Sequence, residues 1–600
     1  MARITTEAPS LRNYNFLLLS VAGLGGLLYG VDVGIIGGAL PYLEATSHLS
    51  AEQLSAIVAA VLLGSIFSTI FAGLLADWIG RKPVMILSGI VFVISIPLIA
   101  LSQSYGSLLF GRLLQGASGG FVGVVVPLYL AECLISRHRG RGTAMFQWLL
   151  TLGIVAAALI GMYYSYHVKA VAAVSDAATV FRVKEQAWRH IFWVSLPPGI
   201  LFTLGAFFVS ESPRWLFRRG KRESAMTALL RSRAPEAAQL EFSEMAEIAA
   251  RQSSAKKLAD SLLRRKYVVP FLLACVILFC NTATGINSII GFNTNILLQS
   301  GLSDLGAHWG YVLFTAVNFL ATIVGMMLVD RKGRRFLLTL GTSGIVVSLI
   351  AVAALFWQTE RSNIEARDAV QSMVEQPGHG LTLIYDKTVA ARLLAASGYQ
   401  DDGSLAPHSS LAIIYSFGGF TGATTFVRSD DLSSPIHIDR ASSLPSGRIE
   451  AWFKNPFADL NAARSAPLKI ERARIGRIPT LRHGMIVTLA LFAFVAFFAV
   501  GPGVCVWLAL SELMPTRIRS VGMSIALVIN QAVSTTLAVV FLPIVSKYGY
   551  SSIFLLFAGF TVIYLVTAAF FLPETKGKTL EEMENYFEHR KAPLNAPAGR

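Results

Sequence analysis

Long apolar stretches alternate with short polar segments along most of the chain. A helix of about 20 apolar residues is long enough to cross the hydrocarbon core of a bilayer. The pattern therefore predicts about twelve membrane-spanning helices, at residues 14–40, 54–76, 83–102, 107–132, 143–164, 188–210, 268–298, 306–329, 336–357, 484–510, 520–546 and 551–572. The first stretch is longer than the core of a signal peptide and has no small-residue cleavage site, so we expect it to be retained.

The polar segments between these stretches differ in charge. Residues 42–53 and 299–310 contain no Lys or Arg, whereas the segments around residues 81–82, 137–141, 331–335 and 517–519 are basic. Basic loops of membrane proteins lie on the cytoplasmic side. We therefore predict a multi-pass protein of the cytoplasmic membrane with both termini in the cytoplasm.

Composition agrees with a place in the lipid bilayer. Hydrophobic residues make up 54% of the chain and charged residues 14%, which is too apolar for a soluble protein of this length. Most of the net charge of +15 lies in the cytoplasmic loops, where anionic lipid accounts for it, so we expect no nucleic-acid partner. The four cysteines fall in or beside apolar stretches, and we expect no disulfide and no metal site.

Two motifs occur twice, each time six predicted helices apart. The pattern D-x-x-G-R-[KR] follows the second helix at Asp77 and Arg81 and returns after the eighth at Asp330 and Arg334. At the ends of the fourth and tenth helices a glutamate stands seven residues before an arginine, as Glu132 with Arg139 and as Glu512 with Arg519. Repetition at a fixed offset indicates two homologous halves.

These charged residues lie at helix ends on the predicted cytoplasmic side. Carboxylates and basic groups there can pair within and between helices, which suggests a conformational latch between the two halves. The alternative is that they only fix the topology and cap helix ends. Together with two residues that follow the sixth helix, the candidate latch residues are Asp77, Arg81, Glu132, Arg139, Glu211, Arg214, Asp330, Arg334, Glu512 and Arg519.

A polar insertion of roughly 125 residues separates the ninth and tenth helices, on the outer side by the predicted topology. Two runs rich in β-branched and aromatic residues, at 381–389 and 411–428, predict strands, and we favour a small folded module over a disordered loop. The role of the insertion is not predicted. The expected organisation is 1–213, first six-helix bundle; 214–266, cytoplasmic loop helices; 267–357 and 484–575, second bundle; 358–483, insertion; and 576–600, cytoplasmic tail.

Beside the repeated motifs, five short segments are typical of one family. They are WR at Trp188–Arg189, ESPRWL from Glu211, GIN from Gly285, GPG from Gly501 and PETKGKTLEEM from Pro573. With these motifs the chain resembles the sugar porter family of the major facilitator superfamily, everywhere except in the insertion and some loops. The resemblance implies an all-α membrane protein, with twelve helices in two pseudo-symmetric six-helix bundles around a central cavity that opens alternately to either side.

The resemblance also implies a sugar-binding site in that cavity. Amide side chains both donate to and accept from vicinal hydroxyls, and an indole offers an apolar face to a sugar ring. The matching positions are Gln147, Asn287, Asn318, Trp507 and Asn530. Asn281 and Thr282 replace a pair of glutamines common in the family, Gly291–Phe292 replaces a tyrosine pair, and Gln531 replaces an aromatic residue. The alternative for each polar residue is a hydrogen bond between helices inside the bundle.

Asp32 stands in the middle of the first apolar stretch, where an ionised carboxylate needs a reason to be present. Gly26, Gly30, Gly34 and Gly38 form a smooth stripe on the other side of that helix and predict a closely packed neighbour. Counted from the expected helix ends, Arg112 of the fourth helix lies at a matching depth, which predicts an ion pair. The resemblance places this pair at the family's proton-coupling position; a static ion pair is the alternative.

The leading functional hypothesis is proton-coupled symport of a monosaccharide, a hexose or pentose, or of a polyol. A proton-independent facilitator and a non-transporting sugar sensor are the alternatives. The sequence lacks a nucleotide-binding loop of the G-x-x-x-x-G-K-[ST] type and a catalytic constellation, so we expect no enzyme. We also expect no cofactor, the proton gradient as the energy source, and a monomeric transport unit in contact with lipid, sugar and protons.

Overall fold

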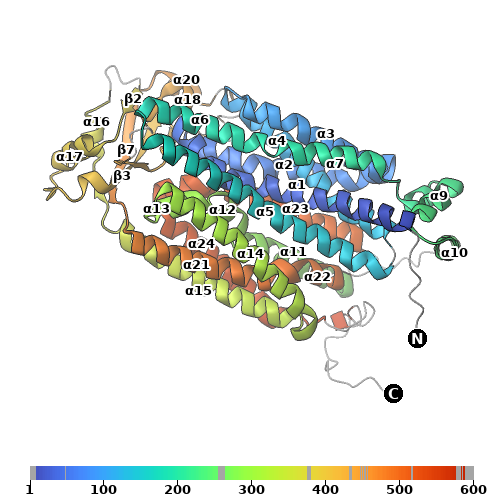
Figure 1. The fold of residues 1–600 in the computed structure, drawn as a ribbon. Coiled ribbons are helices and arrows are strands. Elements are labelled where there is room, and N and C mark those ends of the chain that lie inside the picture. The colour runs from blue at the N-terminus through green and yellow to red at the C-terminus, as the bar shows by residue number, and fades with distance from the viewer. Residues whose placement is uncertain are drawn as a thin grey trace.

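The computed structural model describes residues 9–47, 49–134, 136–254, 264–374, 380–430, 435–445, 447–448, 451, 455, 457–514, 518–575, 583 and 586–587. Within this part of the chain, twelve helical segments are long and apolar enough to span a membrane, as predicted. They run side by side, with the insertion at one end of the bundle and the loop helices α9 and α10 at the other (Figure 1). We call these the insertion end and the loop-helix end.

The first half contains six spans and the loop helices. The spans are α1 (Pro9–Ser47), α2 (Ala51–Ile79), α3 (Arg81–Ala100), α4 (Tyr105–Cys133), α5 (Ser136–Ala172), and α6 (Ala177–Trp193) continued by α7 (Leu196–Phe208). The loop helices are α8 (Pro213–Arg218), α9 (Arg222–Ser232) and α10 (Pro235–Ser254). The sixth span is interrupted where α7 begins with two prolines, because proline lacks the backbone N–H that a continuous helix needs.

The second half repeats this plan with more interruptions. Its helices are α11 (Arg265–Ala283), α12 (Ile286–Gly291), α13 (Asn293–Gln299), α14 (Asp304–Lys332), α15 (Arg334–Glu360), α21 (Leu481–Val500), α22 (Pro502–Leu513), α23 (Arg519–Tyr548) and α24 (Tyr550–Val566), followed by the π-helical turn Thr567–Phe571. The seventh span, predicted as one helix, breaks at Gly285. That glycine has a left-handed φ of 83°, and a Cβ atom there would lie 2.3 Å from the Phe557 ring.

The glycine stripe of the first span packs against α5. A Cβ atom at Gly30 would lie 1.9 Å from the carbonyl oxygen of Leu150, and one at Gly26 would lie 2.4 Å from that of Phe146. No side chain fits at such distances, so the backbones of α1 and α5 touch. The predicted close approach on this face is confirmed.

The insertion folds as a module with its own buried apolar core. One sheet has the strand order β1 (Ile364–Glu365), β7 (Leu468–Arg477), β3 (Ser409–Phe417) and β4 (Phe420–Ala423), with β5 (Val427–Arg428) also on β3. A second sheet pairs β2 (Gly380–Leu383) with β6 (Ile436–Asp439). The helices are α16 (Arg367–Gln371), α17 (Lys387–Ala396), α18 (Arg440–Ser443) and α20 (Leu460–Ser465), with a 3₁₀ turn at Ala406–His408.

The two predicted strand runs of the insertion have different outcomes. Residues 411–428 form β3, β4 and β5, with a tight turn at Gly418, whose φ is 58°. The run 381–389 is a strand only as far as Leu383. The Asp386 side chain then accepts a hydrogen bond from the backbone N–H of Val389 and starts α17, so the prediction of a strand there is wrong.

Candidate functional site

Asp32 lies in the middle of α1 and faces α4. Its side chain is 1% exposed, and a Cβ atom at Gly119 of α4 would lie 2.9 Å from its Oδ2 atom. In the described part of the chain, neither carboxylate oxygen has a hydrogen-bond partner. Burying an ionised carboxylate without such partners is costly, because its hydration is lost and not replaced. The group is therefore placed inside the protein, against another helix, in a setting typical of functional carboxylates in membranes.

The predicted ion pair between Asp32 and Arg112 is not formed, although the structure describes both residues. Nη1 of Arg112 donates to Gln115 at 2.6 Å and Nε donates to the carbonyl oxygen of Ile57 at 3.5 Å. Asp32 and Arg112 interact electrostatically without contact. Both side chains are 1% exposed, so each is held inside the bundle.

The depth estimate behind this prediction was wrong. It assumed that the first helix ends near Leu40, but α1 continues through Pro41 to Ser47. Asp32 thus lies about 22 Å from the insertion end of its helix, whereas Arg112 lies about 10 Å from the start of α4, at 1.5 Å per residue. About two helical turns separate their depths.

Three of the predicted substrate residues lie together between α11 and α23. The Asn530 amide donates to the carbonyl oxygen of Leu278 at 3.0 Å and also to the Thr282 hydroxyl. Asn281, next to Thr282, is 7% exposed, and its Oδ1 has no hydrogen-bond partner within the described residues. The amide donors of Asn530 therefore join α23 to α11, which is the alternative to sugar binding that the sequence left open. Asn281 retains an acceptor, its Oδ1 atom.

The remaining predicted substrate residues lie on several helices. Asn287 donates to the Ser534 hydroxyl at 2.8 Å, a partner on α23 that no sequence motif indicated. Gln147 of α5 and Asn318 of α14 are half-buried on two helices that pack against each other. The Trp507 side chain is not among those that the structure describes.

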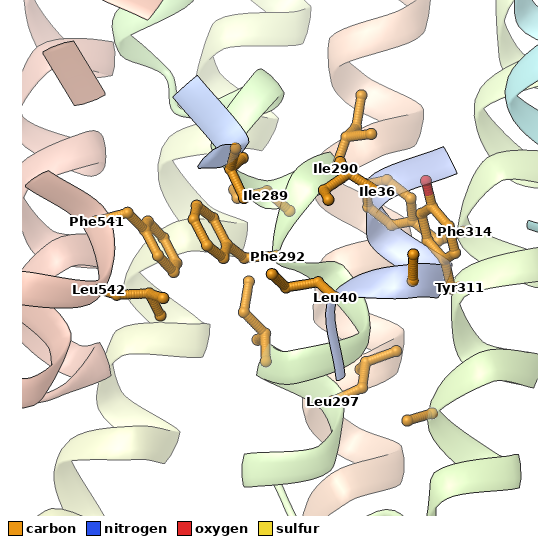
Figure 2. Packing of buried hydrophobic residues seen from close by; sticks show 14 of the residues in the cluster. Ile36, Leu40, Ile289, Ile290, Phe292, Leu297, Tyr311, Phe314, Phe541 and Leu542 are labelled. Carbon is orange, nitrogen blue, oxygen red and sulfur yellow. The ribbon is translucent and has the colours of Figure 1, made fainter. Parts of the chain in front are cut away.

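An apolar layer closes the bundle between these residues and the insertion end. Phe292 and Phe541 stack with their ring centroids 4.4 Å apart and their planes 6° from parallel. Figure 2 shows the two rings face to face, with Ile36 and Leu40 of α1 beside them. We call Ile36, Leu40, Phe292 and Phe541 the apolar layer; all four are at most 2% exposed. Phe292 occupies part of the position where the family has its tyrosine pair, so an aromatic group is kept there.

Polar contacts also join the two halves near the insertion end. The Tyr311 hydroxyl donates to the carbonyl oxygen of Gly34 at 2.7 Å, and His308 lies 3.3 Å from that of Gly38. Asp304, at the start of α14, accepts from the Tyr42 hydroxyl at 3.0 Å and from the Ser165 hydroxyl at 2.5 Å. Together with the apolar layer, these bonds hold the insertion end closed.

At the loop-helix end, the predicted charged cluster forms within the first half. Arg81 is 2% exposed and contacts Asp77 and Glu132, each at 2.8 Å. Glu132 also accepts from the Ser212 hydroxyl at 2.5 Å and lies 3.5 Å from Arg218. These pairs tie α2, α4 and the segment after α7 together. A latch between the two halves would also require a contact with the second half, and none of these pairs makes one.

Two glutamates cap corresponding helices in the two halves. Glu211 accepts from the first two backbone N–H groups of α3 at 3.0 and 3.2 Å, and Glu574 accepts from those of α15 at 3.0 and 3.1 Å. A glycine precedes each helix, Gly80 with φ 108° and Gly333 with φ 88°. Burial raises the pKa of Glu211, while the backbone N–H groups lower it. Glu574 lies within the motif PETKGKTLEEM, but no role was predicted for it, because the backbone donors that it caps leave no pattern in the sequence.

The other candidate latch residues have separate outcomes. Arg214 lies 3.7 Å from Glu241 of α10 and so joins the loop helices. Arg334 donates to the carbonyl oxygen of Val329 at 3.2 Å, at the junction of α14 and α15. The side chains of four further candidates lie outside those that the structure describes, namely Arg139, Asp330, Glu512 and Arg519.

Comparison with known proteins identifies relatives over nearly the whole chain. The family model described as "Sugar (and other) transporter" matches residues 18–373 and 475–587. The glucose transporter GlcP of Staphylococcus epidermidis is 26% identical over 577 residues, which cover 96% of this chain and 98% of the relative. The human proton myo-inositol cotransporter is 25% identical over 592 residues, covering 97% of this chain and 83% of the relative.

Solved structures share the fold. The inward open conformation of the xylose transporter XylE from E. coli superimposes with a TM-score of 0.62 at 19% sequence identity. The match covers 95% of this chain and 99% of that protein. The chain therefore shares the fold of this transporter, with two six-helix halves.

Proposed function

Because the chain belongs to the sugar transporter family, we propose that it carries a hexose, a pentose or a polyol across the cytoplasmic membrane in symport with protons. The observation that carries the proton coupling is Asp32, a carboxylate buried between α1 and α4 without hydrogen-bond partners among the described residues. A structural ion pair with Arg112 would not explain why the Asp32 carboxylate is buried there, since Arg112 donates to other groups. A proton taken up and released at Asp32 does explain its place.

The substrate site that we propose lies in the central cavity on the loop-helix side of the apolar layer. Asn281 offers an unpaired carbonyl oxygen there, and Gln147 and Asn318 are half-buried amides on α5 and α14. Amides of this kind suit the hydroxyls of an uncharged sugar or polyol. The names of the relatives, which mention glucose, myo-inositol and xylose, support the same substrate class.

Coupling follows from the relative position of Asp32 and Arg112. When they approach, the guanidinium stabilises the ionised carboxylate, and when they separate, the buried carboxyl is more stable with its proton bound. A conformational change that alters this separation therefore loads or releases one proton. The structure, which is closed at the insertion end, corresponds to one end state of this cycle. In that state the Asp32 carboxyl group is not in contact with Arg112.

We further propose that the loop-helix end faces the cytoplasm and the insertion lies outside. The basic segments at residues 81–82 and 331–335 fall at the loop-helix end, which agrees with the positive-inside rule. With the insertion end closed, the central cavity then opens inward. The proton gradient would supply the energy, with one chain as the transport unit and no cofactor.

Uptake by proteoliposomes tests this function. The purified chain is assayed with radiolabelled glucose, galactose, xylose, fructose and myo-inositol, with and without an inward proton gradient. A gradient of one pH unit supports up to about tenfold accumulation at one proton per sugar. We expect accumulation of one of these substrates with the gradient, and equilibration without it.

Asp32→Asn separates coupling from transport. We expect this variant to lose accumulation but to retain exchange of labelled for unlabelled substrate, because only the titratable group is removed. Glu244→Gln, which makes the same change on an exposed face of α10, is the matched control and should behave like the unmodified chain. Unchanged accumulation in Asp32→Asn would leave a proton-independent facilitator, and the absence of any uptake would favour a sensor.

A further inference from the structure

A cavity of about 480 Å³ lies at the insertion end, between the insertion and the bundle. Its walls come from the ends of α1, α5 and α6 and from α13 and the start of α14. Residues 423–428, which connect β4 to β5 and include β5, and the start of β6 form its roof. A volume of this size is within the range of small-molecule sites.

The apolar layer separates this cavity from the proposed substrate site. Tyr42, Glu44 and Asn295 line the cavity, while Leu40 and Phe292, in the adjacent turns of the same spans, are fully buried in the layer. A ligand in this cavity would therefore not contact the proposed substrate site. The cavity is also lined by residues of the insertion, which does not take part in the proposed substrate site.

One wall of the cavity carries a fixed polar group with an unused acceptor. Asn295 is 7% exposed and its amide nitrogen donates to Glu44, whose carboxylate also bonds to the Thr425 side chain of the roof. Within the described residues, Oδ1 of Asn295 has no hydrogen-bond partner. Leaving a buried carbonyl oxygen unpaired costs free energy, and a ligand hydroxyl that reached it would supply the missing hydrogen bond.

The charges around the cavity balance one another. Three of its lining residues are acidic and three are basic: Glu44, Asp304 and Asp430, and Lys169, Lys184 and Arg428. Arg428 is neutralised locally, since its guanidinium donates twice to Asp430, at 2.9 and 2.8 Å. Such a lining attracts neither an anion nor a cation strongly, but it offers donors and acceptors beside the apolar groups of Leu298 and Phe426.

We propose that this cavity is a second binding site for a small, uncharged, hydroxyl-rich molecule, a monosaccharide or polyol, enclosed between the insertion and the transport bundle. Asn295 and Glu44 provide hydrogen bonds from the bundle. Arg428 holds the roof in place, because its Nη1 donates to the carbonyl oxygens of Leu298 and Leu302, each at 3.3 Å. The choice of sugars and polyols as the ligand class rests in part on the proposed function. The site gives the insertion a role in recognising the same class of molecule outside the membrane.

Cysteine protection tests the site without relying on transport. Thr425→Cys places a thiol in the roof, and Arg392→Cys places one on the exposed face of α17, away from the cavity, as the matched control. Both full-length proteins in proteoliposomes are labelled with a membrane-impermeant maleimide. Glucose, xylose or myo-inositol is added outside, with potassium chloride as the osmotic control and gluconate as a charged analogue. The unmodified chain gives the background from its four native cysteines.

We expect one neutral compound to slow labelling at position 425 at least fivefold, with no change at position 392. Asn295→Ala and Arg428→Gln, each added to Thr425→Cys, should raise the half-protecting concentration about tenfold. Two variants are used because either alone could fold poorly. Asn287→Ala, which removes the hydrogen bond to Ser534 and lies outside this cavity, should leave that concentration unchanged.

Three results would overturn the site. They are no protection by any neutral compound, stronger protection by gluconate, and loss of protection in Asn287→Ala, which would mean that the label reports on the central cavity. Uptake is measured in the same proteoliposomes. Uptake without protection would reject this site and keep the transport function, whereas protection without uptake would keep the site and reject transport.

Discussion

The hydrogen bond from Tyr311 to Gly34 joins the two halves at the closed insertion end, and its removal should shift the balance between the two open states. The hydroxyl donates at 2.7 Å to a backbone carbonyl oxygen, and the tyrosine is fully buried. A Cβ atom at Gly37 would lie 2.7 Å from the tyrosine ring, so α1 accommodates the ring only because a glycine stands there. Opening the insertion end must break this contact.

Tyr311→Phe removes the hydroxyl and keeps the ring. A hydrogen bond between membrane helices contributes about 0.6 to 1.5 kcal/mol. The bond is lost only from the state that is closed at the insertion end. The equilibrium between the closed and open states therefore shifts about threefold to tenfold in favour of the open state.

Distance measurement by electron spin resonance checks this shift. Spin labels at Val174→Cys and Tyr548→Cys stand on exposed positions at the insertion ends of the two halves. We expect a larger long-distance population in Tyr311→Phe. Tyr564→Phe is the matched control, because its buried hydroxyl has no hydrogen-bond partner within the described residues. A change smaller than twofold, or an equal change in the control, would refute the reasoning.

Two further predictions concern the loop-helix end and are read from thermal unfolding in detergent. Gly333→Ala should lower the midpoint well below that of Gly220→Ala. Both glycines have a positive φ, 88° and 76°, but only at Gly333 would a Cβ atom meet the capping carboxylate of Glu574, at 2.4 Å. Equal midpoints of the two variants would contradict the role of the cap. Arg81→Gln should cost about 3 to 5 kcal/mol, because it leaves Glu132 buried with its main partner removed. Arg218→Gln, at a side chain that is 57% exposed, should cost at most about 1 kcal/mol, and a similar loss in both variants would show that burial does not decide the effect.

The sequence predicted those parts of the fold that depend on local composition. Each span needs about twenty apolar residues, so the runs could be counted, and the repeated motif at Arg81 and Arg334 revealed the two halves. The end of α1 was missed, because the uninterrupted apolar stretch ends near Leu40, whereas α1 continues through Pro41 to Ser47. The matching depth assigned to Asp32 and Arg112, which the family resemblance reinforced, came from that error, and the pair is not formed in this structure.

The candidate site was predicted less completely for a different reason. Whether Asn530 faces the cavity or donates to Thr282 depends on the rotation of α23 against α11, which tertiary packing decides. The partners Ser534 and Glu574 lie hundreds of residues from the groups that they bind, and the groups bound by Glu574 belong to the backbone. A single sequence contains no trace of such pairings.

The paired caps have a mechanical consequence. Glu211 fixes the end of the sixth span to the start of α3, and Glu574 fixes the end of the twelfth span to the start of α15. The next basic side chain repeats the tie in both halves: Lys82 donates to a carbonyl oxygen at the end of α7, and Arg335 donates to one in the π-helical turn. In each half, two neighbouring spans are thereby tied together at the loop-helix end, so that a tilt of one carries the other with it. A tilt of spans tied in this way that widens the bundle at one end narrows it at the other.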